Sequence, residues 1–477
     1  MKIPSKDLLS ALFQFNPWLV PGKSAMALPE WHRSVFTSVL QWVQAPPQNR
    51  AVLLGGARQV GKTTVFRQVI QHLLQQGVPA GNVLYCTFDH PLFRTVGLEA
   101  VLRTWREFQP KLQGPEFLFL DEIQLVPDWQ IWLKHQTDFE PNRRIAVTGS
   151  ATPLLMDKTE SGVGRWHTIT LPTLSFYEYL QLRQAAGKPE LFPEIPDLPG
   201  LNELFDWTEG QFLALQPTIQ TLQGLFSMYL LRGGFPQSAL TDSVELAQQF
   251  LREDILDKVL KRDMTALYGV RHPMELEQMF LYLCMHDGEM LDFGTLTENL
   301  GTSRPGIQNY LELLRSTYLI HTLRQFGYGK QVLRSQLKVY LCDPAIASSV
   351  LARGQSVLED PEKMGLLVEG ACFKHLLDCG GQLSFWRGKK NQEVDLVFQR
   401  GEQVVPFEVK YRSQHTTRRA IPGMLEFLRQ KKLQRGVVFT RQSSDFSLER
   451  VDDLTILRIP AALGCHLLGR QTAERMR

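Results

Sequence analysis

The segment from Gly56 to Thr63 constrains the fold of this chain more than any other part of the sequence. It reads GARQVGKT and matches the pattern G-x-x-x-x-G-K-[ST], in which a glycine-rich turn wraps a phosphate chain at the start of a helix. The apolar residues 51–54 predict a buried strand before it, and residues 64–74 predict a helix after it that stops near Gly77. This order predicts a nucleoside triphosphate site; a glycine-rich turn without a ligand is the alternative.

Candidate residues for hydrolysis follow from the chemistry of the phosphates. Lys62 is expected to reach the β- and γ-phosphates, and the Thr63 hydroxyl to ligate Mg²⁺. A second apolar run, 117–120, ends in Asp121 and Glu122, as a buried strand does when it delivers a carboxylate to Mg²⁺. Asp121 is expected to hold the metal, and Glu122 to polarise the attacking water. An ordinary strand end is the alternative.

Two later segments add candidates around the same phosphates. The predicted strand 144–147 runs into Thr148 and Ser150, whose hydroxyls are candidates to sense the γ-phosphate; a capped turn is the alternative. Arg165 follows a flexible loop and is a candidate to neutralise transition-state charge on the nucleotide of a neighbouring subunit. This interpretation implies self-association of the chain. A surface salt bridge is the other interpretation of Arg165.

These motifs together resemble those of AAA-type ATPases of the archaeal-ATPase-like group. The resemblance rests on GARQVGKTT at 56–64, YCTFDHP at 85–91, LFLDEIQ at 118–124, TGS at 148–150, Gly164-Arg165 and LSF at 174–176. RGGFP at 232–236, EVD at 393–395 and EVK at 408–410 resemble the uncharacterised C-terminal region that is usually fused to that ATPase. The ATPase resemblance implies ATP and Mg²⁺ as cofactors. It implies nucleotide-binding roles for Gly56, Ala57, Arg58, Gln59, Val60, Gly61, Lys62, Thr63, Thr64, Asp121 and Ser150. Ala151 stands where a second serine is frequent, which leaves the choice between Ser150 and Thr148 as the sensor open.

The apolar patterning predicts five parts along the 477 residues. Residues 1–48 predict helices, and 49–180 alternate helices with strands at 51–54, 83–88, 116–120 and 144–147, the pattern of a parallel sheet. The proline-rich stretch 181–222 predicts a loop-heavy insertion, and helices at 223–232 and 241–268 complete a lid that ends at 271. Residues 272–345 predict short helices and then strands. Residues 346–477 predict a helix, a β-meander, a helix and a strand.

A second candidate active site lies in the predicted meander. In 392–398, the apolar residues Val394, Leu396 and Phe398 alternate with Glu393 and Asp395. In the next strand Glu408 and Lys410 share one face. A hairpin therefore gathers Asp395, Glu408 and Lys410 on one surface, and Glu369 on the preceding helix can lean toward them. Carboxylates beside a lysine suit a Mg²⁺ site with a cation near the attacking water.

This set resembles the core of the PD-(D/E)XK restriction-endonuclease-like fold. Asp395, Glu408 and Lys410 match its acid and acid-x-lysine positions, and Glu369 matches its helix acid; Val394 stands in place of the proline. The resemblance implies metal ligation by Glu369, Asp395 and Glu408. It implies catalysis by Asp395, Glu408 and Lys410 on a nucleic acid. A degenerate domain that only binds or docks is the alternative.

Residues 294–315 predict a helix–turn–helix between the two sites. Ser303 is expected to cap the second helix, with Ile307, Leu311 and Leu314 on its inner face and a wing beginning at 316–320. The outer face offers Arg304, Gln308 and Arg315 to DNA, opposed by Glu312. Packing between domains is the other role.

Composition limits the class of protein. No apolar run approaches the about 18 residues of a membrane span. The N-terminus shows no convincing signal-peptide cleavage site. Six scattered cysteines without C-x-x-C pairs predict reduced thiols and a cytoplasmic location. Basic residues outnumber acidic ones in 401–477, which suits either a polyanion or a solvated basic face.

We therefore predict an α/β protein with a P-loop NTPase parallel sheet, a helical and winged-helix region, and a small α/β restriction-endonuclease-like domain. The predicted function is Mg²⁺-dependent ATP hydrolysis coupled to a nuclease-like domain that acts on nucleic acid. ATP, DNA and further copies of the chain are the predicted partners, and no membrane. An ATP-gated switch or scaffold that recruits a protein partner is the alternative. A metabolic kinase is disfavoured because no small-molecule acceptor signature is present.

Overall fold

The computed structural model describes residues 4–22, 27–150, 164–190, 192–264, 270, 272–327, 336–388, 392–411 and 421–476. The chain divides into two compact units. The first comprises residues 1–172 with 316–318 and 476–477, and the second comprises 173–315 and 319–475. The domain boundary predicted at 180 therefore falls inside the second unit, and the finer boundaries at 271 and 345 stay predictions.

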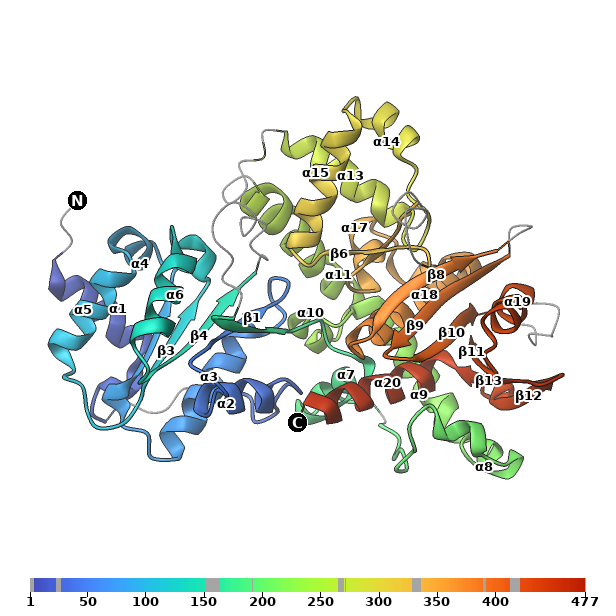
Figure 1. Ribbon diagram of the computed structural model, residues 1–477, viewed down its shortest axis with the longest axis horizontal. Helices are drawn as coiled ribbons and strands as arrows, with labels where there is room; N and C mark the ends of the chain where they lie inside the picture. The colour runs from blue at the N-terminus through green and yellow to red at the C-terminus, as the bar shows by residue number, and fades with distance from the viewer. Residues whose placement is uncertain are drawn as a thin grey trace. The chain divides into compact units, whose positions relative to one another are not determined.

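A five-stranded parallel sheet forms the centre of the first unit (Figure 1). Its strands are β1 (Ala51–Gly55), β2 (Val83–Thr87), β3 (Glu116–Asp121), β4 (Arg143–Gly149) and β5 (Trp166–Thr170). They lie in the order β2-β3-β4-β1-β5. The predicted α/β class with a parallel P-loop sheet is confirmed. Sequence reasoning missed β5, because this edge strand is partly exposed and presents no continuous apolar run.

Helices cover both faces of this sheet because its strands are apolar on both sides. One face packs against α1 (Ser5–Phe15), α5 (Leu98–Phe108) and α6 (Trp129–Phe139), with Leu118 and Leu120 of β3 in that core. On the other face, Phe119 contacts Phe66 of α3 (Lys62–Gln75). Helix α2 (Phe36–Gln44) packs beside α3, and α4 (Pro91–Val96) follows β2. The alternation along β3 fixes where its last residue, Asp121, points.

The second unit begins with helices. They are α7 (Phe176–Ala185), η5 (Glu203–Asp206), α8 (Glu209–Ala214), α9 (Gln216–Arg232), α10 (Pro236–Leu240), α11 (Val244–Arg252), the π-helix η6 (Glu253–Asp263), α13 (Pro273–Met285), α14 (Phe293–Leu300) and α15 (Arg304–Ser316). The antiparallel pair β6 (Ile320–Leu323) and β7 (Lys338–Leu341) follows α15. The segments α17 (Ala345–Val350), η7 (Gly354–Glu359) and α18 (Pro361–Asp378) lead to the second sheet.

Two of the helix predictions need correction. Residues 181–222 were expected to be largely loop, but α9 starts at Gln216, since Pro217 is compatible with the first turn of a helix. The helix expected at 241–268 begins later than predicted and continues from Glu253 as the π-helix η6. The Ser243 side chain accepts a hydrogen bond from the backbone N–H of Leu246, and α11 therefore begins after this cap.

A six-stranded mixed sheet completes the second unit (Figure 1). Its strands are β8 (Gln382–Arg387), β9 (Glu393–Arg400), β10 (Gln403–Lys410), β11 (Arg435–Thr440), β12 (Ser447–Val451) and β13 (Leu454–Pro460). The meander β8-β9-β10 is antiparallel, and α19 (Pro422–Lys431) connects it to β11, which pairs parallel to β10. Strands β12 and β13 and the helix α20 (Ala461–Met476) were not predicted.

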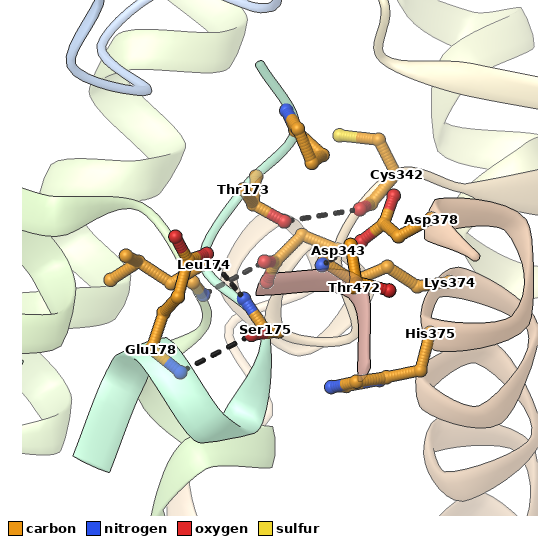
Figure 2. Close-up of polar contacts among 12 residues, drawn as sticks. Thr173, Leu174, Ser175, Glu178, Cys342, Asp343, Lys374, His375, Asp378 and Thr472 are labelled. Carbon is orange, nitrogen blue, oxygen red and sulfur yellow. Dashed lines mark hydrogen bonds and ion pairs between the residues drawn. The ribbon is translucent and has the colours of Figure 1, made fainter. Parts of the chain in front are cut away.

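Two of the motifs noted in the sequence, LSF and RGGFP, meet at the start of the second unit. The N–H of Leu174 donates to the carbonyl of Gly234 at 2.7 Å. The N–H of Gly234 donates to Oδ2 of Asp343 at 2.8 Å, and the Tyr229 hydroxyl donates to the Leu174 carbonyl at 3.0 Å. Figure 2 shows Leu174 and its neighbour Thr173 beside Asp343. These motif residues therefore hold segments of the second unit together.

Replacing Gly234 by alanine is expected to lower the free energy of unfolding by about 1–3 kcal/mol. An added Cβ would lie 2.5 Å from the carbonyl oxygen and 2.8 Å from the nitrogen of Leu174, and these backbone atoms have little room to move. Urea denaturation measures the effect. The control is Gly210→Ala in α8, where a Cβ would meet open space and no loss is expected. Equal stability of the two variants would contradict this account.

Candidate functional site

The predicted phosphate-binding loop lies between the carboxyl end of β1 and the start of α3. Gly61 precedes the helix with a φ of +102°, which favours glycine. At Gly56 an added Cβ would lie 2.3 Å from the carbonyl oxygen of Leu171, so the loop packs directly against the chain that leaves β5. Both glycines of the motif are therefore required by backbone geometry.

Lys62 is folded back onto its own loop. Its ammonium donates to the carbonyl oxygens of Gly56 and Ala57, both at 2.8 Å, and its side chain is almost fully buried. The loop therefore holds the charged end of Lys62 among backbone atoms at the N-terminus of α3, where the helix dipole favours an anion.

Asp121 joins three elements of the first unit. The Thr63 hydroxyl on α3 donates to its Oδ2 at 2.8 Å, and the Tyr85 hydroxyl on β2 donates to the same oxygen at 2.7 Å. The Thr148 hydroxyl on β4 donates to Oδ1. Burial, followed by the charge of Asp121, raises the pKa of Tyr85, so this phenol stays a donor. Threonine and aspartate oxygens are brought together here as the sequence predicts.

Glu122 sits in a left-handed conformation directly after β3, with φ of +54°. Such strain in a residue other than glycine persists where surrounding contacts enforce it. Its Oε2 accepts hydrogen bonds from Ser150 Oγ at 3.0 Å and from Gln124 Nε2. Its backbone N–H donates to Thr148 Oγ1 at 3.0 Å. Ser150 thus faces Glu122, whereas Thr148 bridges Glu122 and Asp121.

Arg165 lies away from the loop of its own chain. Its carbonyl accepts from the N–H of Ala51, so it precedes β5 at the amino edge of the sheet, while the phosphate-binding loop follows the carboxyl edge. Its guanidinium pairs with Asp138 of α6, with Nε 3.1 Å from Oδ1. The structure does not bring Arg165 to the other candidate residues of the first unit.

A cavity of about 610 Å³ in the second unit contains the second predicted set. Glu369 of α18, Asp395 of β9, and Glu408 and Lys410 of β10 all line it. The predicted convergence of these four side chains is therefore seen. Other residues that line this acidic cavity are Gly288, Glu289, Met290, Lys338, Leu366, Gln392, Glu393, Pro422 and Gly423.

A bulge in β9 shapes one wall of the acidic cavity. Trp386 pairs with Val394, but Ser384 pairs with Val397, so β9 holds one extra residue between these pairs. Val394 and Val397 both pack in the core beside α19, and Phe398 is only partly buried. The strict alternation predicted through Phe398 is therefore wrong. Asp395 lies within the bulge, where its Oδ2 accepts from the N–H of Val409 at 2.8 Å.

Glu408 and Lys410 form a close pair in this cavity, with Nζ 2.5 Å from Oε1. The other oxygen of Glu408, Oε2, is buried and has no hydrogen-bond partner among the described residues. Burial, followed by the nearby charge of Asp395, raises the pKa of Glu408 to about 8, against the opposing effect of Lys410. The carboxyl group is therefore protonated at neutral pH unless a further cation approaches it.

Glu369 is held by β7, an element outside the predicted set. Its Oε1 accepts from the Tyr340 hydroxyl at 2.8 Å and lies 3.9 Å from Nζ of Lys338. Lys338 also pairs with Glu393 at 2.5 Å. Burial, then the charge of Asp395, raises the pKa of Glu369 to about 7. Among the residues with described positions, no three His, Cys, Asp or Glu side chains form a ready-made metal site.

The predicted helix–turn–helix consists of α14 and α15. Ser303 caps α15 through a hydrogen bond from the N–H of Gly306 at 3.3 Å, and the expected inner residues Ile307, Leu311 and Leu314 are buried. Arg304, Gln308 and Arg315 are exposed. Arg315 pairs with Glu312 at 2.6 Å. The predicted wing corresponds to β6 and β7, but 316 still belongs to α15.

Three contributing side chains were missed by sequence reasoning. Gln124 holds Glu122 and lies two residues beyond it, within the quoted LFLDEIQ motif, so its position was a usable signal. Lys338 and Tyr340 are two positions apart in β7, so their side chains share a face of the strand. Nothing in a single sequence shows that β7 lies against α18. These two residues could be found only from the tertiary structure.

Comparisons with known proteins agree with the geometry of the first unit. Residues 48–180 match an AAA domain family, 223–356 match a domain of unknown function (DUF8612), and 364–461 match another (DUF4143). The sheet order, the loop and this match define a P-loop ATPase domain. The matches beyond it confirm neither the winged-helix nor the nuclease-like prediction.

Several proteins are similar to this chain over most of its length. An uncharacterised protein of Haemophilus influenzae is 23% identical over 380 residues, covering 78% of this chain and 85% of its own. An uncharacterised protein of Mycobacterium tuberculosis is 26% identical over 393 residues, which cover 80% of this chain and 75% of that protein. Among solved structures, the Walker-type ATPase of Pyrococcus abyssi has a TM-score of 0.39 at 15% identity, covering 67% of this chain and 95% of its own. AMPPCP-bound DnaA of Aquifex aeolicus has a TM-score of 0.28 at 16% identity, and the match covers 59% of this chain and 86% of DnaA.

Two observations concern membrane-spanning helices and cysteines. No helix within the described ranges has the length and apolar character to cross a membrane. All six cysteines are free thiols, and five of them are buried. The cytoplasmic location stays a prediction.

Stability is expected to fall as the pH rises from about 5 to about 8. The folded state keeps a proton on Glu408 up to about pH 8, whereas the group ordinarily titrates near 4.5, so the folded state binds more protons in this window. Glu408→Gln removes this contribution and should make the fall shallower by up to about 1.4 kcal/mol per pH unit. Urea denaturation at several pH values measures it. The control is Glu402→Gln, at an exposed position, and it should retain the wild-type slope. A wild-type slope in E408Q as well would contradict the prediction.

Proposed function

We propose that this chain is a Mg²⁺-dependent ATPase whose first unit binds and hydrolyses ATP. The observation that carries the proposal is the hydrogen bond of 2.8 Å between Thr63 at the phosphate-binding loop and Asp121 at the end of β3. A hydroxyl and a carboxylate from these two elements are oxygen donors of the kind Mg²⁺ takes beside nucleotide phosphates. Thr63 and Asp121 would hold the ion, which would neutralise charge on the β- and γ-phosphates.

The other loop residues have roles that follow from their positions. The N–H groups from Gly56 to Thr64 would surround the phosphates. Lys62 would exchange its two carbonyl partners for phosphate oxygens, because an ammonium gains more from an anion than from neutral carbonyls. Binding of a triphosphate would therefore release the Lys62 side chain from its own loop.

Glu122 would orient and deprotonate the attacking water. Ser150 and Gln124 hold its carboxylate, so we assign Ser150 the sensor role and Thr148 a supporting one. Because Arg165 lies at the far edge of the sheet, we propose that it serves a nucleotide bound to a second copy of the chain. Release from Asp138 would then accompany self-association.

ATP turnover by the purified chain tests these roles. Glu122→Gln is expected to lower kcat by about 10²–10⁴-fold, since it removes general-base catalysis. Lys62→Ala is expected to weaken ATP binding as well. Arg165→Ala should lower turnover and leave ATP affinity unchanged. Exposed Glu107→Gln in α5 is the matched control and should turn over like wild type. Equal turnover in wild type, K62A and E122Q would reject the assignment.

As a second function, we propose Mg²⁺-dependent cleavage of nucleic acid in the acidic cavity. The observation in its favour is that Glu369, Asp395, Glu408 and Lys410 line one cavity. The order α18, β8-β9-β10, α19, β11, with β11 parallel to β10, also suits a restriction-endonuclease-like core. The buried oxygen of Glu408 without a partner fits a metal ligand. Asp395 and Glu408 would hold Mg²⁺, joined by Glu369, and Lys410 would polarise the attacking water.

DNA is the proposed substrate, with α14, α15 and the β6–β7 pair as a winged-helix-like module for binding it. The exposed Arg304 and Gln308 on α15 support this role. The rival function is an ATP-gated switch whose second unit recruits a protein partner. The close Lys410–Glu408 pair favours the rival, because it occupies the lysine that hydrolysis needs.

A DNA cleavage assay distinguishes the nuclease function from the ATP-gated switch. The protein is incubated with plasmid and single-stranded DNA, with Mg²⁺ or Mn²⁺, in the presence and absence of ATP. Cleavage that Asp395→Asn or Lys410→Ala reduces at least 100-fold is the expected result. Glu402→Gln, in the turn between β9 and β10, is the control that should cleave normally. Absence of both cleavage and ATP-dependent DNA retention would favour the switch.

A further inference from the structure

Strand β7 supplies a cation to the acidic cavity from outside the core formed by α18, α19 and the second sheet. Lys338 lies at the start of β7, and its side chain is only 7% exposed. Its ammonium is 2.5 Å from Oε1 of Glu393 and 3.9 Å from Oε1 of Glu369. Tyr340 lies two positions further along the same strand, and its hydroxyl donates to Oε1 of Glu369 at 2.8 Å. One strand thus provides two of the groups that face Glu369.

The two lysines of the cavity form separate ion pairs with its acids. Lys410 pairs with Glu408, and Lys338 lies between Glu393 and Glu369. Only the first pair leaves a buried oxygen, Oε2 of Glu408, without a partner among the described residues. Asp395 lines the same cavity as both pairs. The Lys410–Glu408 pair therefore leaves a carboxylate oxygen available to a further cation, whereas Lys338 lies between both of its acids.

Carboxylates, rather than burial, hold this ammonium in place. A lysine removed from water loses solvation, which opposes its charged form. The carboxylates of Glu393 at 2.5 Å and Glu369 at 3.9 Å replace that solvation. The ammonium of Lys338 therefore lies within the acid cluster that a divalent cation would enter.

We infer that Lys338 is a positioning residue that stands in for a divalent cation between Glu369 and Glu393. The cavity consequently accepts a single divalent ion, at Asp395 and Glu408, and holds it less tightly than its acids would without Lys338. Repulsion between an ammonium and a divalent ion a few ångströms apart is strong in a partly buried site. This inference rests on the nuclease-like site of the proposed function and specifies its metal content.

Isothermal titration of the full chain with MnCl₂, without nucleotide or DNA, tests this. An Asp395→Asn/Glu408→Gln double variant serves as the blank for ions bound elsewhere. Wild type is expected to bind one Mn²⁺ in the cavity. Lys338→Met should tighten binding about tenfold or more, or add a second ion. Lys338→Arg, which keeps the charge, should resemble wild type. Lys363→Met, an exposed lysine on the same helix as Glu369, should also resemble wild type.

Unchanged or weaker Mn²⁺ binding by K338M overturns the inference, as does the absence of binding to both proteins. A crystal of the wild-type chain soaked in Mn²⁺ gives an independent answer if K338M does not fold. The expected ion lies beside Asp395 and Glu408, with Lys338 still on Glu393. An ion between Glu369 and Glu393, or no ion in the cavity, overturns the inference. Because neither measurement needs DNA, lack of cleavage would reject the nuclease function alone.

Discussion

The carboxylate of Asp121 is the point on which the first unit depends. Three different elements donate hydroxyl hydrogen bonds to it: α3 through Thr63, β2 through Tyr85 and β4 through Thr148. This meeting is possible because parallel strands end at the same edge of a sheet, and β3 lies between β2 and β4. An ionised carboxylate is buried only when such donors replace water. The hydroxyls therefore hold the acid of Asp121 at the edge of the sheet, beside the phosphate-binding loop.

In the acidic cavity, the negative charge of the buried carboxylates is compensated in a different way from that of Asp121. Its acids receive few hydroxyl donors, and lysines supply most of the compensation, since Lys410 pairs with Glu408 and Lys338 with Glu393. Where this compensation is incomplete, the proton stays on the group, and the pKa values of Glu369 and Glu408 rise. The acids of the cavity are thus neutralised by side chains and protons of the chain itself.

Local patterns made the first site and the C-terminal hairpin predictable. An apolar run, a glycine-rich turn and a helix place Lys62 and Thr63, and strand alternation puts Glu408 and Lys410 on one face. Prediction failed where distant segments decide the outcome. The edge position of β5, the bulge around Asp395 and the approach of β7 to α18 depend on tertiary contacts that no single segment encodes. The local sequence makes Arg165 a candidate, but it does not show that the partner of Arg165 is Asp138 on α6.

The two sites differ in how firmly each holds its buried lysine. At the loop, the Lys62 ammonium is bound to neutral carbonyls of Gly56 and Ala57, which compete weakly with a triphosphate. In the cavity, Lys338 is bound to carboxylates in a buried setting, where the loss of a charge-assisted pair is costly. The Lys62 ammonium is thus held more weakly than the Lys338 ammonium. Under the proposed metal binding, an ion at Asp395 and Glu408 would lie beside the ammonium of Lys338.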